Sequence, residues 1–326
     1  MATPAYAGEI RPTLAVIQAA REFLAGYFSP TRLVEATSLS RVTGKRVHLK
    51  LETELPTASF KVRGAMWALA EKLKTEAVAE VVASSTGNHG AAVAYAGQKL
   101  GVKATIFLPE NCNPVKRDRI AKLGATIVER GKDITDAFEE VKRYAKERSA
   151  YFLNDATDPV LPAGPGTIGM EILEQAPDTQ AIYVPMGDTA LIRGIAAAAR
   201  QISTGVRIVG VQAERAPAYT LSWRYGEAIC TETCDSIADG LATRTTFAEN
   251  VLAIRELVDD VVLVSEGCML DAIGRLLFEE QVLAEPSGAA TTAALLSETK
   301  IGEEKIALVV SGANLSKDVL RQVVAN

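Results

Sequence analysis

Short runs of β-branched residues alternate along the chain with longer, alanine-rich stretches. The first pattern is typical of buried strands and the second of helices, so their alternation predicts an α/β protein. Gly101 and Gly124 stand where helix C-terminal glycines are expected. Over residues 80 to 152 the pattern predicts strands and helices in turn at Val81–Ala83, Ala91–Leu100, Lys103–Leu108, Val115–Leu123, Thr126–Val128 and Ile134–Arg148.

A second stretch of the same kind follows. It predicts strands at Ala181–Val184, Arg207–Val211, Val261–Val264 and Lys305–Val310, with helices after Leu191, Cys268, Ser287 and Ser316. The N-terminal part adds a helix near Leu14–Phe23 and a strand at Arg46–Glu52. The chain shows no internal repeat and no low-complexity tract, and no long linker separates the two stretches. We therefore expect two α/β domains of one class that the chain connects more than once.

Charge and composition narrow the possible partners. The 326 residues contain 35 Lys and Arg against 40 Asp and Glu, a net charge of −5, so the basic footprint of a nucleic-acid-binding protein is lacking. No apolar run approaches the roughly 20 residues that span a bilayer. Residues 1–12 show no basic region followed by an apolar stretch, so a secretory signal is not indicated. We expect a cytoplasmic protein with neither a nucleic-acid nor a membrane partner.

Histidine and cysteine usage restricts the chemistry. His48 and His89 are the only two histidines, which excludes a multi-histidine metal site and leaves few bases for Ser-His or Cys-His catalysis. The four cysteines form no Cys-x-x-Cys pair, and Cys230 and Cys234 are spaced for one helix face. Free thiols in a reducing compartment are the simplest interpretation. An enzyme with this composition needs chemistry that histidine does not supply.

Residues 164–169 match the dinucleotide fingerprint G-x-G-x-x-G. That motif requires a buried strand before it, whereas here the preceding run contains Pro159 and Pro162, which disfavour a central strand. We expect a turn that enters a helix at this point, and no nucleotide site. The chain contains no P-loop and no G-x-S-x-G elbow.

The run Thr57-Ala-Ser-Phe-Lys-Val-Arg-Gly-Ala65 places Lys61 among small and apolar residues at the start of a helix. Burial lowers the pKa of an amine and frees its lone pair, as Schiff-base chemistry requires. By itself the run rather favours a lysine whose stem lies on apolar surface and whose ammonium reaches water.

Three further runs follow predicted strands and open helices or polar turns. Ser84-Ser-Thr-Gly-Asn-His-Gly90 presents successive N–H groups and hydroxyls that suit a carboxylate, although Ser and Asn could equally serve only to cap the helix. Val184-Pro-Met-Gly-Asp-Thr-Ala-Leu191 is a possible phosphate cradle, and Val309-Val-Ser-Gly-Ala-Asn-Leu315 is a comparable turn. Open α/β sheets bind ligands at the carboxyl ends of their strands, where these runs lie.

Five motifs in series resemble the fold-type II pyridoxal-phosphate (PLP) enzymes, most closely the branch of serine/threonine dehydratases and serine racemases. They are Ser59–Ala65, Ser85–Gly90, Ile237–Leu241, Ala284–Ala290 and Ser311–Asn314, and the resemblance covers residues 28–320. It implies two open twisted-sheet α/β domains like those of the tryptophan synthase β-subunit, with PLP in the cleft between them. The implied boundaries are 53–153 for the small domain, and 1–52 plus 154–326 for the large PLP-binding domain.

The resemblance also implies residue roles. Lys61 would form the Schiff base with PLP and act as base on the substrate Cα–H. Phe60 would lie beside the cofactor ring, Asn88 would bond its phenolic oxygen, and Ser311 would face the pyridine nitrogen. A neutral Ser311 moderates the electron sink and suits β-elimination. The remaining implied contacts are Gly187, Asp188, Thr189, Ala190 and Leu191 at the phosphate, Gly240 and Glu285 beside the cofactor, and Ser85, Thr86, Asn88 and His89 around the substrate carboxylate.

The sequence departs from the family pattern at three places. Thr86, here a catalytic candidate, stands where racemases have a serine that acts as acid and base on the opposite face of the substrate. Asp188 and Thr189 interrupt a phosphate loop that is usually four glycines, and we expect the Asp188 carboxylate to turn away from the phosphate toward a backbone or basic partner. At the family's divalent-cation site Glu214 and the Ala218 carbonyl match, but Thr220 replaces an aspartate, which puts a bound cation in doubt.

The function implied is a PLP-dependent dehydratase, or ammonia-lyase, which converts a β-hydroxy amino acid of the serine/threonine type into a 2-oxo acid and ammonia. A serine-type racemase on the same scaffold and a non-catalytic PLP-binding protein are the alternatives. β-Replacement fits less well, because Arg63-Gly64-Ala65 and His89 match the dehydratase branch. The chain ends soon after its last predicted helix, which favours a catabolic or broad-substrate enzyme. We expect a homodimer.

Overall fold

The computed structural model describes residues 11–85, 87–110, 112, 114–132, 134–298 and 302–325. Thr86 therefore lies outside the described residues. The described strands are β1 (Leu33–Glu35), β2 (Arg46–Leu51), β3 (Glu80–Ser84), β4 (Lys103–Leu108), β5 (Thr126–Glu129), β6 (Tyr151–Phe152), β7 (Ala181–Pro185), β8 (Arg207–Ala213), β9 (Asp260–Val264) and β10 (Lys305–Val310).

Helices connect most of these strands. The described helices are α1 (Leu14–Leu24), α2 (Thr37–Thr43), the 3-10 turn η1 (Glu52–Glu54), α3 (Lys61–Thr75), α4 (Asn88–Leu100), α5 (Pro114–Lys122), α6 (Ile134–Arg148), α7 (Ala163–Gln175), α8 (Ala190–Ile202), α9 (Ala218–Tyr225), the 3-10 turn η2 (Asp239–Leu241), α10 (Ala248–Leu257), α11 (Glu266–Phe278), α12 (Pro286–Ser297) and α13 (Lys317–Ala325). None of the helices in this part of the chain is long and apolar enough to cross a membrane.

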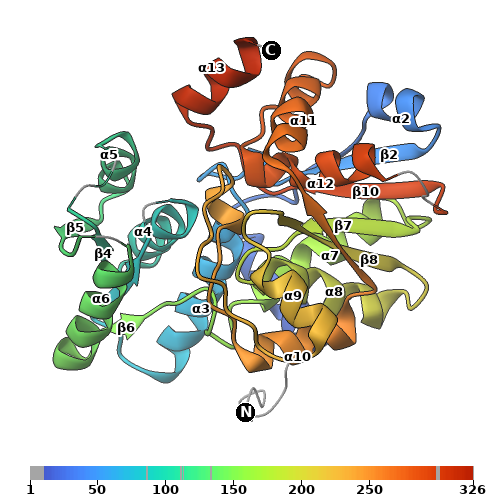
Figure 1. The fold of residues 1–326 in the computed structure, drawn as a ribbon. Coiled ribbons are helices and arrows are strands. Elements are labelled where there is room, and N and C mark those ends of the chain that lie inside the picture. The colour runs from blue at the N-terminus through green and yellow to red at the C-terminus, as the bar shows by residue number, and fades with distance from the viewer. Residues whose placement is uncertain are drawn as a thin grey trace.

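The strands form two open sheets, as the sequence predicted. A six-stranded sheet has the order β1-β2-β10-β7-β8-β9, and a four-stranded sheet has the order β5-β4-β3-β6. Every pair of neighbouring strands is parallel except β1 and β2. In Figure 1 the small sheet with α4, α5 and α6 lies to one side of the large sheet, and α3 lies between the two groups.

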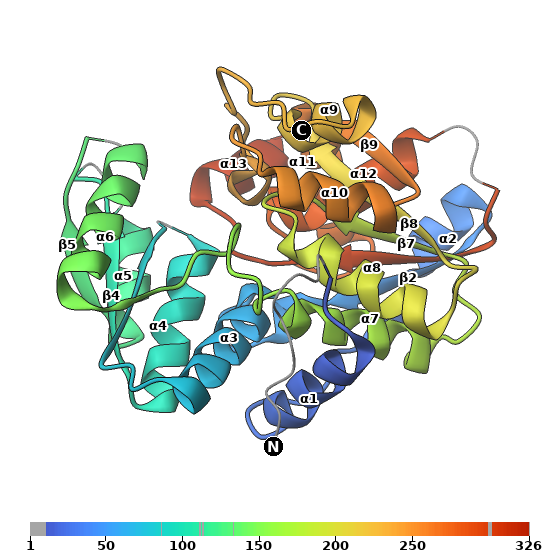
Figure 2. The ribbon, with the colours of Figure 1, turned by 90° about the horizontal axis from the view of Figure 1, so that it is seen from below.

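Each sheet is covered on both faces, which explains why its central strands are apolar throughout. In β7, Ile182 and Val184 pack with α7 and α8, whereas the alternate residues Ala181 and Tyr183 pack with α11 and α12. Figure 2 shows α1 and α7 on one side of the large sheet and α11 to α13 on the other. In the small sheet Val81 faces α3 and α4, and Val82 faces α6.

The G-x-G-x-x-G run lies in α7, and no described strand leads directly into it, so the strand-turn-helix setting of the dinucleotide motif is not found here. Its glycines allow close helix packing instead. A Cβ at Gly164 would meet the Arg63 carbonyl oxygen of α3 at 2.4 Å. A Cβ at Gly169 would meet the Ile195 carbonyl oxygen of α8 at 2.7 Å.

The sequence missed the shortest elements, β1 and β6, which have three and two residues. Strands this short carry little periodicity of their own and exist because longer neighbours offer hydrogen bonds. All four cysteines are free thiols, as expected, but Cys230 and Cys234 lie in a loop and share no helix face. The domain boundaries near residues 53 and 153 stay a prediction.

Candidate active site

The loops singled out in the sequence follow the carboxyl ends of parallel strands. Ser85 follows β3, Gly187 follows β7 and Ser311 follows β10. The antiparallel bridge between Ser59 and Gly312 joins the last of these loops to the segment that begins α3. Residues distant in the sequence thus meet where open α/β sheets bind ligands.

Lys61 is the first residue of α3, and its backbone is fixed from two sides. The Phe60 N–H donates to the Ser311 carbonyl oxygen at 3.0 Å, and the Ala313 N–H donates to the Ala58 carbonyl oxygen at 2.9 Å. Ala58 has φ 52°, a conformation that favours glycine, so the turn before Lys61 is strained. The Phe60 ring lies 5.5 Å from Lys61 Nζ. The reactive amine is therefore carried on a constrained turn.

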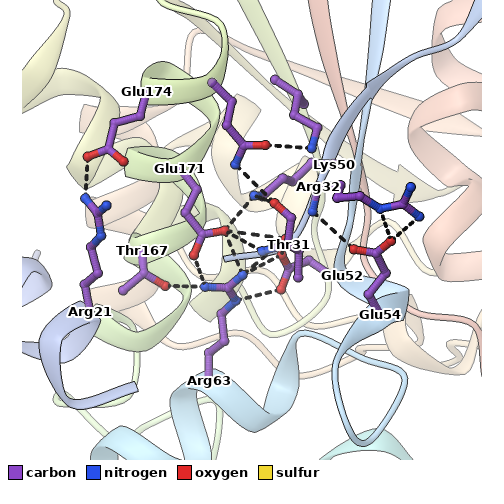
Figure 3. Close-up of polar contacts among 12 residues, drawn as sticks. Arg21, Thr31, Arg32, Lys50, Glu52, Glu54, Arg63, Thr167, Glu171 and Glu174 are labelled. Carbon is purple, nitrogen blue, oxygen red and sulfur yellow. Dashed lines mark hydrogen bonds and ion pairs between the residues drawn. The ribbon is translucent and has the colours of Figure 1, made fainter. Parts of the chain in front are cut away.

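A buried cluster of charges anchors the same turn (Figure 3). The Arg63 side chain is buried, and its guanidinium donates to both carboxylate oxygens of Glu52 at 2.8 and 2.9 Å. It also donates to both oxygens of Glu171, at 2.5 and 2.9 Å, and Lys50 Nζ donates to Glu171 at 2.6 Å. Two cations thus balance two anions. These contacts hold α3 to β2, η1 and α7.

The Lys61 ammonium does not lie alone in apolar surroundings. Its Nζ donates to Asp155 Oδ2, and the Lys61 side chain is only 16% exposed. Burial lowers the pKa of Lys61, but the negative charges of Asp155, Asp188 and Glu285 outweigh it and leave that pKa raised. The expectation that burial lowers the pKa of Lys61 and frees its lone pair is therefore wrong. Imine formation requires the ion pair with Asp155 to open first.

Asp155 was missed by sequence reasoning. Its carboxylate contacts Lys61 Nζ and lies 3.8 Å from His89 Nδ1. Burial raises the pKa of Asp155, but the His89 and Lys61 side chains outweigh it and hold that pKa well below its usual range. Only its position shortly after a strand could have identified Asp155 as a candidate. That strand, β6, has two residues and was not predicted from the sequence.

Asn88 lies in a polar chain that crosses from α4 to the large sheet. Its Nδ2 donates to Glu285 Oε1 at 2.6 Å, and its Oδ1 accepts from Asn314 Nδ2. Burial raises the pKa of Glu285 to about 7. The Ser85–Gly90 and Ser311–Asn314 motifs are thus brought together, with Glu285 between them.

His89 is 6% exposed, and its ring is already engaged. Its Nε2 lies 2.9 Å from the Leu153 carbonyl oxygen, which can only accept, so Nε2 carries the hydrogen. Nδ1 is buried without a hydrogen-bond partner in the described structure. Only Nδ1 and the backbone N–H of α4 therefore remain available, and the predicted contact between His89 and a substrate carboxylate stays a prediction, as does that of Ser85.

The loop before α8 is unusual in its backbone. Thr189 has φ 69°, and its Oγ1 is buried without a hydrogen-bond partner among the described residues. A Cβ at Gly187 would meet the Gly240 carbonyl oxygen at 2.1 Å, so these two predicted cofactor residues touch through their backbones. Ala190 and Leu191 begin α8 and are buried. The loop presents the N-terminus of a 13-residue helix together with an unsatisfied hydroxyl.

Asp188 accepts a hydrogen bond from Thr243 Oγ1 at 3.2 Å. Burial and the charge of Asp155 raise the pKa of the Asp188 carboxyl. The partner of the carboxyl is thus a hydroxyl, in place of the backbone or basic group expected from the sequence.

No group of three or more His, Cys, Asp or Glu that could hold a metal ion occurs in the described part of the chain. At the position where the family pattern has an aspartate, Thr220 donates its hydroxyl to Gln212 Oε1 at 2.9 Å. Glu214 is exposed. These residues give the predicted cation site no further support.

The residues present fit a cofactor that carries both an aldehyde and a phosphate. Lys61 supplies an amine at one end, and the orphaned Thr189 hydroxyl lies with the α8 N–H groups at the other. Ser311 is buried on the loop that contacts Phe60.

The comparisons with known proteins agree with this chemistry. The family described as pyridoxal-phosphate dependent enzyme matches residues 24–312. The L-threonine ammonia-lyase of Thermotoga maritima is 35% identical over 312 residues, which are 96% of this chain and 78% of that protein. Maize serine racemase superposes with a TM-score of 0.91 at 30% identity, covering 97% of both chains. The processed form of threonine deaminase isoform 2 from Solanum lycopersicum gives 0.90 at 30% identity, covering 96% of this chain and 91% of that one.

Proposed function

Because the chain belongs to the family of pyridoxal-phosphate-dependent enzymes and has the fold-type II architecture, we propose that it is a dehydratase for β-hydroxy amino acids of the serine/threonine type. The products would be a 2-oxo acid and ammonia. The observation that carries this proposal is Lys61, a largely buried amine at the start of α3 that contacts Asp155 and lies in the field of Asp188 and Glu285. The 35% identity to an L-threonine ammonia-lyase over most of the chain supports it.

Different residues of the chain would bind the cofactor and transfer the Cα proton. Bound PLP supplies an electron sink for the pair released at the substrate Cα. Lys61 would hold the cofactor through Nζ, and the same atom would accept the Cα proton of the substrate. Gly187 and Thr189, with the N–H groups of Ala190 and Leu191, would hold the phosphate. Phe60, Asn88, Gly240, Glu285 and Ser311 would line the ring.

The substrate carboxylate would bind at the N-terminus of α4. That helix has 13 residues, and the Gly87 N–H that precedes it already donates to Ser85 Oγ at 3.2 Å. A Cβ at Gly90 would meet the Ser85 carbonyl oxygen at 2.4 Å, so the turn is closely packed against the helix. Preorganised N–H donors at a helix N-terminus suit a carboxylate.

A racemase is the second candidate, and the close fit to maize serine racemase favours it. The two activities diverge after the Cα proton is lost. Elimination expels the β-hydroxyl, whereas racemisation returns a proton to the opposite face.

One product assay distinguishes them. The purified holoenzyme is incubated with L-threonine and, separately, with L-serine, and 2-oxo acid, ammonia and D-amino acid are quantified together. We expect 2-oxo acid and ammonia in equal amounts and in excess of D-amino acid. Faster formation of the D-amino acid would replace the dehydratase proposal with the racemase. No product from either substrate would reject both.

A further inference from the structure

Arg193 is a buried cation that no carboxylate contacts in the described part of the chain. It is 6% exposed, and its Nε is buried without a hydrogen-bond partner among the described residues. Its Nη2 donates to the Ala156 carbonyl oxygen at 3.4 Å, which is long for a hydrogen bond and brings no negative charge. Since a guanidinium has five N–H donors in a fixed fork, Arg193 can accommodate a further acceptor.

The surroundings of Arg193 do not compensate its charge. Burial lowers the pKa of Arg193 to about 10, although more distant anionic groups partly offset this effect. Of these groups, Asp158 already accepts a hydrogen bond from Tyr151 Oη at 2.5 Å, and Glu249 is exposed. A buried charge without a partner is costly, and an anion that binds beside it removes the cost. The side chain therefore points to an anionic ligand.

The position of Arg193 on α8 indicates where that ligand binds. The Arg193 N–H donates to the Thr189 carbonyl oxygen at 2.9 Å, so Arg193 lies one helical turn after the loop 187–190 that opens the helix. Side chains on a helix lean toward its N-terminus, and residues four apart are neighbours on one face. The Arg193 side chain therefore extends back toward this loop, and its guanidinium reaches the Ala156 carbonyl oxygen, next to Asp155.

The same end of α8 holds a second donor without an acceptor. Thr189 Oγ1 is buried and has no hydrogen-bond partner among the described residues. A hydroxyl and a guanidinium one turn apart suit an anion with several oxygen atoms, such as a phosphate.

The charge of a phosphate also requires more than the loop provides. A helix N-terminus is equivalent to about half a positive charge, whereas a phosphate monoester carries about −1.5 to −2 at neutral pH. The loop itself adds the carboxyl of Asp188, where the family pattern has glycine. The full positive charge of Arg193 offsets both.

We propose that Arg193 binds the phosphate group of the cofactor, together with Thr189 and the N–H groups at the start of α8. The inference rests on the cofactor site of the proposed function, but not on which amino acid is the substrate. It also gives a reason for the unusual loop, because the carboxyl of Asp188 is tolerated where a buried cation lies one turn away.

A residue retained for a ligand stabilises the folded protein only when the ligand is bound. Arg193→Met keeps a similar stem and removes the unpaired charge, so we expect the apo-protein to be at least as stable as the wild type. Urea unfolding of the two apo-proteins measures this. A guanidinium that serves the fold would give the opposite result.

Titration of the apo-protein with PLP and, separately, with pyridoxal isolates the phosphate. Both compounds present the same aldehyde to Lys61 and differ only in that group. We expect the ratio of the pyridoxal to the PLP dissociation constant to fall at least about tenfold in Arg193→Met, with the pyridoxal constant itself changed less than about threefold. Arg200→Met is the control, because Arg200 lies later on the same helix and pairs with Asp259. It should change the ratio less than about threefold.

Arg193→Lys is the conservative variant. It keeps a positive charge but has no Nε–H and no planar fork, so its ratio should lie between those of Arg193→Met and the wild type. A ratio no higher than that of Arg193→Met would contradict a bound anion.

A fall of less than tenfold in Arg193→Met, an equal fall in Arg200→Met, or an Arg193→Met apo-protein that unfolds at lower urea than the wild type overturns the inference. If the wild type still binds PLP at Lys61 in that case, the proposed function stands without it. If the wild-type apo-protein does not bind PLP at all, the proposed function itself fails.

Discussion

The guanidinium of Arg63 meets the carboxylate of Glu171 with two hydrogen bonds, Nη1 to Oε1 at 2.5 Å and Nη2 to Oε2 at 2.9 Å. Both side chains are buried. Such a fork fixes direction as well as distance. Because Arg63 follows Lys61 by two positions, this pair sets the orientation of the turn that carries the reactive amine against α7.

Arg63→Met should destabilise the protein by about 3–5 kcal/mol, because it leaves Glu52 and Glu171 buried with only Lys50 to compensate them. Urea unfolding of the variant and wild-type apo-proteins measures this. Arg63→Lys retains the positive charge but cannot make the two parallel hydrogen bonds to Glu171. We expect it to be less destabilised than Arg63→Met. A loss below about 1 kcal/mol for Arg63→Met would show that the cluster contributes little net stability.

Lys61→Ala should abolish turnover and the covalent cofactor link that borohydride fixes, while the fold survives, because it removes both the Schiff-base nitrogen and the proton acceptor. Mass spectrometry of peptides after reduction locates the link. Lys72→Ala is the matched control, since Lys72 lies on the same helix and pairs with Glu76 at its exposed end. Cofactor found on another lysine in the wild type would contradict the site assignment.

The sequence predicted those parts of the site that are encoded locally. Lys61, Asn88 and Ser311 lie in motifs that are rich in small residues and stand at the start of a helix or the end of a strand. Both features can be read from the sequence. The Arg63 cluster was not predictable, because its partners come from β2, η1 and α7 and meet only through packing. Asp155 was missed for a related reason. The strand before it, β6, is too short to show a hydrophobic pattern and is held by its pairing with β3.

Glu285 should make the stability of the apo-protein depend on pH. Burial raises its pKa in the folded state from 4.5 to about 7, so between these values the folded protein keeps a proton that the unfolded chain has lost. Stability is then highest below pH 4.5 for this group and falls as pH rises toward 7, by at most about 2–3 kcal/mol.

The measurement is urea unfolding across this pH range for the wild type and Glu285→Gln, whose difference isolates the one carboxyl. We expect the wild type to lose stability relative to the variant as pH rises. A difference that does not change with pH, or that changes in the opposite direction, would show that Glu285 is ionised throughout.

A substitution of Thr189 tests the predicted phosphate loop. In this loop the chain departs most from the family pattern, which is usually four consecutive glycines. A β-branched residue at φ 69° is strained, and its hydroxyl is buried without a partner among the described residues, so two unfavourable features coincide at one position. Both would be compensated if the hydroxyl donates to a phosphate oxygen. Thr189→Val keeps the shape and the strain but removes the donor. Since hydrogen bonds to charged groups contribute about 1.5–3 kcal/mol, PLP affinity should fall roughly 10- to 100-fold.

Asp188→Asn provides the contrasting result in the same titration of apo-protein with PLP. If the Asp188 carboxyl stays on Thr243, as the 3.2 Å hydrogen bond places it, removing its charge changes the affinity less than about threefold. A carboxylate about 4 Å from the phosphate would instead repel it by several kcal/mol at an effective dielectric near 20, and the amide would then bind PLP far more tightly. A large gain in Asp188→Asn would therefore place the carboxylate against the phosphate and give Thr189 a different role.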